Sequence, residues 1–136
     1  MMLRFLDTNI LLYTISANPA ESAKRQIAID IIAPMDWVVS AQVLQEFYAN
    51  ATRKRAGGIS IEAANTLLRQ FIPRAKVAVD SALVVQAAQI SQQHHISYWD
   101  AAIVAAAVRS SATQLVTEDL NAGQVIEGIT VVNPFS

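Results

Sequence analysis

The chain has 136 residues, of which 53% are hydrophobic and 15% are charged, so it suits one compact domain with a substantial core and not a disordered segment. No apolar run approaches the about 20 residues of a membrane span, and the first residues lack the apolar region of a secretory signal, which predicts a cytoplasmic protein. The absence of cysteine excludes disulfides, thiolate catalysis and Cys-ligated zinc. The net charge of −1 gives no overall basic field for nucleic acid, so a nucleic-acid ligand would need a local basic surface or a bound metal.

Apolar segments of strand length alternate with segments of helical periodicity along the whole chain. The strands are expected at residues 2–7, 37–39, 76–79, 115–116 and 129–132. The helices are expected at residues 8–16, from the N-cap Asn18 to the stop at Pro34, from the cap Ser40 to Arg53-Lys54-Arg55, from the cap Ser60 to the break at Pro73, from the cap Asp80 to His94, and from Ser97 onward.

This alternation predicts a single α/β domain over residues 1–136, with a central parallel sheet flanked by helices. The last helix contains the segment YWDAAIVAAAVRS. Because alanine lets neighbouring backbones approach closely, this helix is expected to be central.

Four acidic residues stand where a metal-dependent site would need them. Asp7 and Asp119 each follow a predicted strand, Asp100 lies in the first turn of a helix, and Glu46 lies inside another helix. Ligands of open parallel sheets gather beyond the carboxyl ends of the strands, so Asp7 and Asp119 should reach the same edge. Clustered carboxylates repel one another, and oxygen ligands favour Mg²⁺ or Mn²⁺ as the cation that relieves the repulsion.

Each of these acids also has a purely structural interpretation. Asp7 would cap the helix that follows it, Asp100 would form a capping pair with Ser97, Asp119 would stabilise a turn, and Glu46 would be a solvated helix residue. The spacing of the acids alone leaves both interpretations open.

Four short motifs occur in a fixed order, followed by a characteristic tail. They are Leu6-Asp7-Thr8-Asn9-Ile10-Leu11, Ser40 with Glu46 in the helix after it, Tyr98-Trp99-Asp100-Ala101-Ala102, Leu115-Val116-Thr117-Glu118-Asp119-Leu120, and the ending from Gly128 to Phe135. With these motifs, almost the whole chain resembles PIN-domain proteins, and specifically the small VapC-type ribonuclease toxins of toxin–antitoxin pairs.

The resemblance implies a Mg²⁺-dependent endoribonuclease, with Mn²⁺ as an alternative ion, that leaves a 5′-phosphate on the downstream product. It implies an RNA substrate, a cognate antitoxin protein and a homodimer as partners. The implied catalytic residues are Asp7, Glu46, Asp100 and Asp119, and the implied metal ligands among them are Asp7, Asp100 and Asp119. The implied supporting residues are Thr8, Asn9, Thr117 and Asn121. The family's T-x-D pattern selects Asp119 over its neighbour Glu118, which is then expected to be exposed.

Three other functions fit parts of the sequence. A PIN-fold nuclease could process RNA without acting as a toxin, and a non-catalytic PIN module could bind RNA or protein, although the intact set of four acids argues against the latter. A phosphatase with Asp7 as its nucleophile is disfavoured because Asn9 occupies the second position of the D-x-D pattern.

Some further residues carry two interpretations. The basic run Arg53-Lys54-Arg55 could bind RNA phosphates, or it could complement the helix dipole. Trp99 could stack on a base, but packing in the core or in an interface is favoured. His94 and His95 could bind a metal or act as a general base, but they are expected to end a helix. The apolar face with Leu83, Val84 and Ala87 is expected to be core, with part of this face available to a dimer interface.

Overall fold

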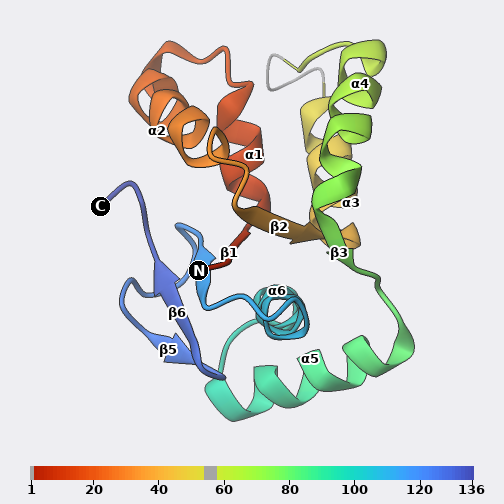
Figure 1. Ribbon diagram of the computed structural model, residues 1–136, viewed down its shortest axis with the longest axis vertical. Coiled ribbons are helices and arrows are strands. Elements are labelled where there is room, and N and C mark those ends of the chain that lie inside the picture. Colours follow the sequence, from red (N-terminus) through yellow and green to blue (C-terminus); the bar gives the residue numbers. More distant parts are fainter. Residues whose placement is uncertain (1, 54–57) are drawn as a thin grey trace.

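A single six-stranded sheet organises the molecule, in the strand order β3-β2-β1-β4-β6-β5. The computed structural model describes residues 2–53 and 58–136 (Figure 1). The strands are β1 (Arg4–Leu6), β2 (Trp37–Ser40), β3 (Ala75–Val77), β4 (Gln114–Val116), β5 (Val125–Ile126) and β6 (Ile129–Val132). All neighbouring strands pair in parallel except β5, which is antiparallel to β6. The predicted α/β class with a mainly parallel sheet is therefore confirmed.

Helices cover both faces of the sheet (Figure 1). On one face stand α1 (Thr8–Thr14), α2 (Ser22–Ile32), α3 (Ala41–Ala51) and α4 (Ile61–Phe71). On the other face lie α5 (Ser81–His94) and α6 (Tyr98–Arg109). Two short 3₁₀ turns, η1 (Pro19–Glu21) and η3 (Ile72–Arg74), each contain a proline, and the second of these, Pro73, is the predicted helix break.

All the described α-helices except α2 begin at a side-chain cap, because an exposed first-turn N–H group needs an acceptor. Side-chain oxygens accept the backbone N–H three residues ahead at Ser40, Ser60, Asp80 and Ser97. These four predicted caps are confirmed. Asn18 differs from the expectation, because it caps the 3₁₀ turn η1 through a 3.0 Å bond from the Ala20 N–H, and α2 begins only at Ser22.

The alanine-rich helix α6 is the most deeply buried helix of the described chain, as expected. Every residue from Ala101 to Ala107 is buried. Small side chains let this helix lie close beneath the sheet, where it contacts β2, β4 and β6, and beside α5. On the other side of the sheet, Trp37, Phe47 and Phe71 pack edge to face. The first turn of α6 is thereby held near the carboxyl ends of the central strands.

The helix ends differ in one respect from the sequence-based expectation. Helix α3 ends at Ala51, ahead of the basic run; Lys54 and Arg55 lie outside the described residues. At the end of α5, His94 is the last helical residue and His95 is a left-handed cap with φ of 57°, so the prediction for this pair is confirmed.

Within the described residues, no helix has both the length and the apolar character needed to cross a membrane.

Strand β5 is the one element of the sheet that the sequence analysis missed. It has only two residues and joins β6 through Glu127 and Gly128, both at positive φ (51° and 79°). Such a pair of left-handed residues is typical of a tight two-residue hairpin. A segment of two residues is too short for its apolar pattern to distinguish a strand from a loop.

Candidate active site

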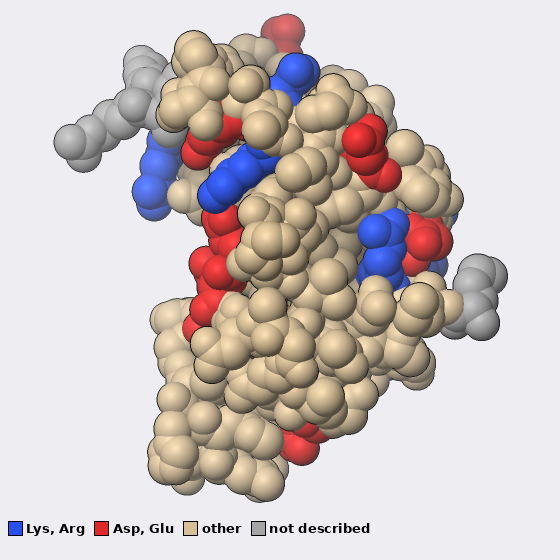
Figure 2. Space-filling model, turned by 90° about the vertical axis from the view of Figure 1, so that its left-hand side faces the viewer, with Lys and Arg blue, Asp and Glu red and all other residues tan. Residues whose placement is uncertain are grey.

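The four predicted acids line one pocket of about 210 Å³ beyond the carboxyl ends of β1 and β4. Asp7, Glu46, Asp100 and Asp119 reach it from four different segments of the chain. On the face drawn in Figure 2, acidic side chains follow one another along a hollowed edge, with lysine or arginine side chains directly above them. The structure thus brings together the acids that the sequence analysis singled out.

Asp7 is buried and fixed at both carboxylate oxygens. Its Oδ1 accepts the Thr8 N–H at 2.7 Å, which makes Asp7 the N-cap of α1, and its Oδ2 accepts the Thr117 hydroxyl at 2.7 Å. Burial raises the pKa of Asp7 to about 6, the two hydrogen bonds oppose that shift, and repulsion from Asp119 and Glu46 adds to it. Asp7 therefore caps a helix and lines the acidic pocket at the same time.

Glu46 is held toward the pocket by Thr8. The Thr8 hydroxyl donates a 2.9 Å hydrogen bond to Glu46 Oε1, while the Thr8 backbone N–H serves Asp7. Packing of α3 against α1 makes this contact, which joins residues 38 positions apart in sequence. Glu46 is half-buried and is not the freely solvated helix residue of the structural alternative.

Asp119 stands in the turn after β4. Its Oδ2 accepts a hydrogen bond of 3.2 Å from the Asn9 amide, and its backbone N–H donates to the Thr117 hydroxyl oxygen at 3.1 Å. Desolvation raises the pKa of Asp119, and the negative charges of Asp100 and Glu118 raise it further. Asn9 and Thr117 thus hold this acid in place, and their supporting role in a reaction stays a prediction.

Asp100 occupies the first turn of α6. Its backbone N–H donates to Ser97 Oγ at 3.0 Å. Among the residues that the structure describes, the Asp100 carboxylate makes no hydrogen bond, so the reciprocal capping pair with Ser97 is not formed. The carboxylate lines the pocket, and its charge bears on Asp119.

Two expectations about nearby residues are wrong. Glu118 is half-buried, not exposed, because it accepts hydrogen bonds from the Tyr13 hydroxyl at 2.5 Å and from Lys24 Nζ at 2.9 Å. Burial opposes the shift, but these two donors hold the pKa of Glu118 below its usual value. Asn121 is exposed and does not line the pocket, so the structure does not place it beside the acids as expected.

One residue of the pocket wall lies differently from the expectation, and another was missed by the sequence analysis. Trp99 is 67% exposed and lines the pocket beside Asp100, so it is not a core residue. Asn50 also lines the pocket, and its side-chain amide donates to the Glu46 backbone oxygen at 2.7 Å. Asn50 lies one helical turn after Glu46, and this spacing is the sequence signal that could have placed it on the same face of the helix.

The donors of the pocket suit a hard divalent cation, because they are carboxylate oxygens with neighbouring amide and hydroxyl groups. The raised pKa of Asp7 and of Asp119 reflects burial together with like-charge repulsion, which a cation would relieve. Within residues 2–53 and 58–136, no three His, Asp or Glu side chains already stand close enough to hold one ion directly. Mg²⁺ commonly keeps several waters and binds through one or two carboxylates, so the wider spacing remains compatible with this class of ion.

Comparisons with known proteins give one family match and several structural neighbours. The model of the PIN domain family matches residues 4–126. A toxin–antitoxin complex from Klebsiella pneumoniae has a TM-score of 0.69 at 18% identity, covering 96% of this chain and 97% of that chain. FitAcB from Neisseria gonorrhoeae has a TM-score of 0.65 at 21% identity, covering 97% and 98%. VapC20 from Mycobacterium tuberculosis, described as a Sarcin-Ricin loop cleaving toxin, has a TM-score of 0.61 at 23% identity, covering 82% and 86%. No curated protein sequence matches the chain.

Proposed function

The chain belongs to the PIN domain family, and from this premise we propose that it is a Mg²⁺-dependent endoribonuclease that acts as the toxin of a toxin–antitoxin pair. The observation that carries the proposal is the single pocket lined by Asp7, Glu46, Asp100 and Asp119. Fold similarity to toxin–antitoxin proteins supports the toxin assignment.

The four acids of the pocket and the polar residues that hold them would share the tasks of phosphodiester hydrolysis. Asp7, Asp100 and Asp119 would hold Mg²⁺ or Mn²⁺, which when bound supplies a Lewis acid for the phosphate and a more acidic attacking water. Glu46, fixed by Thr8, can orient that water. Thr117 and Asn9 keep Asp7 and Asp119 in place, so that little reorganisation is needed during the reaction.

The proposed partners are RNA, a cognate antitoxin and a second copy of the chain. A basic antitoxin side chain, especially arginine, would pair well with carboxylates in the site that the cation otherwise occupies. On α5, Leu83 and Ala87 are buried, whereas Val84 and Val85 are 43% and 58% exposed, and these valines offer apolar surface to a second copy. Size-exclusion chromatography with light scattering would measure the mass of the purified chain.

A cleavage assay tests the nuclease, and a growth assay tests the toxin. Purified protein should cut structured or unstructured RNA with Mg²⁺ and not with EDTA, and Asp7→Asn should be inactive. Overexpression should slow growth, and co-expression with the product of the neighbouring gene should restore it. Cleavage without any effect on growth would favour an RNA-processing nuclease, and no cleavage by the folded protein would refute the nuclease.

A further inference from the structure

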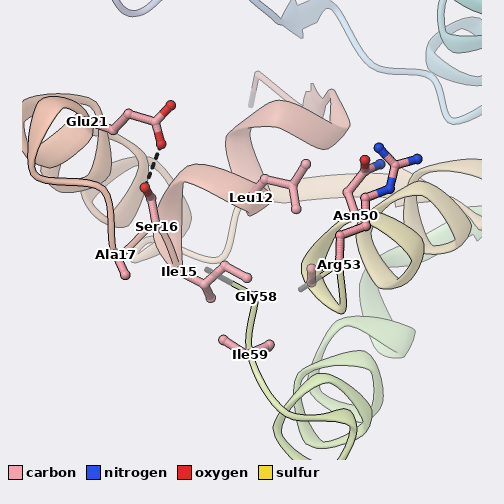
Figure 3. Close-up of a pocket in the computed structure, with 10 residues that line it drawn as sticks. Leu12, Ile15, Ser16, Ala17, Glu21, Asn50, Arg53, Gly58 and Ile59 are labelled. Atoms are coloured by element: carbon pink, nitrogen blue, oxygen red, sulfur yellow. Dashed lines mark hydrogen bonds between the residues drawn. The ribbon is translucent and has the colours of Figure 1, made fainter. Parts of the chain in front are cut away.

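A second cavity lies beside the acidic pocket and has no role in the mechanism described above. It encloses about 240 Å³ between α1 and η1 on one side and the end of α3 on the other. Leu12, Ile15 and Ile59 supply apolar walls (Figure 3). Glu21 stands across the opening from Asn50 and Arg53 (Figure 3). The cavity is smaller than the roughly 300–1,000 Å³ of drug-sized sites, so it suits one planar ring system.

The cavity adjoins the acidic pocket. Leu12 and Asn50 line both. Along α1, Asn9 lines the acidic pocket and Ile15 lines the cavity, a separation of about 9 Å at 1.5 Å per residue. A single strand with one phosphate at the acids would therefore bring a base about one or two nucleotides away to the cavity.

Close backbone packing fixes one wall of the cavity. The Ile59 N–H donates to the Ala51 carbonyl oxygen at 2.9 Å. A Cβ atom on Gly58 would lie 2.7 Å from that same Ala51 oxygen and nearer still to the Arg53 carbonyl, so only glycine permits this approach. The wall that carries Ile59 is thus tied to the end of α3, which also carries Glu46.

The polar groups of the cavity favour one hydrogen-bonding edge of a planar ring bound there. Glu21 Oε1 accepts the Ser16 hydroxyl at 2.6 Å, whereas Oε2 accepts no hydrogen bond from the residues that the structure describes. A carboxylate over apolar walls favours a planar group that donates N–H bonds. Guanine presents adjacent N1–H and N2–H groups, but uracil flanks its one N–H with two carbonyl oxygens, which a carboxylate repels.

We propose that this cavity binds a nucleobase of the RNA substrate next to the scissile phosphate and favours guanine over uracil through Glu21. Arg53, at the opposite rim, is placed to contact a phosphate of the same strand. The inference rests on the proposed function, because the base belongs to the RNA that the acidic pocket would cut.

The test uses the full-length protein and two mononucleotides, GMP and UMP. NMR titrations would follow the methyl groups of Ile15 and Ile59, which report on the cavity and not on the acids. GMP should shift these signals with roughly tenfold higher affinity than UMP, the effect expected of one charge-assisted hydrogen bond. Glu21→Gln should remove most of the discrimination, whereas Glu62→Gln, an exposed glutamate on α4, should keep it.

The failure of this inference and the failure of the nuclease assignment give different results. Equal affinity for both nucleotides, shifts confined to other methyl groups, or unchanged discrimination in Glu21→Gln would each overturn the base site, even if RNA is cut. Absence of metal-dependent cleavage would overturn the nuclease, while selective GMP shifts at Ile15 and Ile59 would still show that the cavity binds guanine.

Discussion

The Thr117 hydroxyl donates a 2.7 Å hydrogen bond to Oδ2 of Asp7, joining the carboxyl ends of β4 and β1. The same hydroxyl oxygen accepts the backbone N–H of Asp119 at 3.1 Å. Thr117 is fully buried, so water cannot replace these bonds. One side chain thereby sets the relative position of two of the four acids.

Thr117→Val should disturb both acids while keeping the shape of the side chain. Asp7 would lose a donor in a buried setting, which should cost about 1–3 kcal/mol of unfolding free energy and raise its pKa further. The rate of RNA cleavage should fall together with the unfolding free energy. Chemical denaturation and an RNA cleavage assay measure the two effects, with the exposed Thr113→Val as the control. Wild-type stability and activity in Thr117→Val would contradict this role.

Asp7→Asn separates helix capping from metal binding. Asparagine caps a helix nearly as well as aspartate and has almost the same volume, so the fold should persist. Loss of the charge should lower RNA cleavage by at least about 100-fold, because a preorganised charge at the reacting centre contributes on that scale. Circular dichroism and cleavage rates provide the readouts, with Asp30→Asn as an exposed control. A folded variant that cuts RNA at the wild-type rate would leave Asp7 with a capping role alone.

The pKa of Asp7 also predicts how stability depends on pH. Its folded-state value of about 6 lies above the ordinary value of 3.8, so the folded protein binds more protons than the unfolded chain between these pH values. Unfolding free energy should therefore fall as pH rises from about 4 to about 6, by roughly 3 kcal/mol from this group, and then level off. Asp7→Asn should flatten this part of the metal-free profile. An identical slope in wild type and variant would show that another group is responsible.

The sequence predicted which acids share one edge of the sheet where a backbone rule applied. Asp7 and Asp119 follow parallel strands and Asp100 follows a helix cap, so local patterns place them near one edge of the sheet. Glu46 depends on how α3 packs against α1, which no local pattern encodes, and only the family resemblance selected it. The error at Glu118 has the same origin: Tyr13 and Lys24, more than 90 residues away in sequence, bind the carboxylate that was expected to face solvent.

Trp99 offers a test of substrate contact that is separable from folding. Because it is 67% exposed, Trp99→Ala should barely change stability. If an RNA base stacks on the indole, the substitution should weaken RNA binding roughly 5- to 150-fold, the range given by stacking of about 1–3 kcal/mol per base. Fluorescence anisotropy with a labelled RNA would measure the change, and Trp99→Phe should retain most of the affinity. Unchanged binding by Trp99→Ala would exclude stacking at this position.

Divalent cations should stabilise the protein through the acidic pocket. A ligand that binds only the folded state raises the unfolding free energy as its concentration exceeds its Kd. Adding Mg²⁺ or Mn²⁺ to EDTA-treated protein should therefore raise the midpoint of thermal unfolding, and more EDTA should reverse the rise.

Asp100→Asn and Asp119→Asn should lose this response to the cation. Without metal, both variants should be at least as stable as wild type, because each removes like-charge repulsion within the pocket. Asp30→Asn should respond as wild type does. A metal-induced rise that survives in both pocket variants would place the cation elsewhere, and a large loss of metal-free stability in both would favour structural roles for these acids.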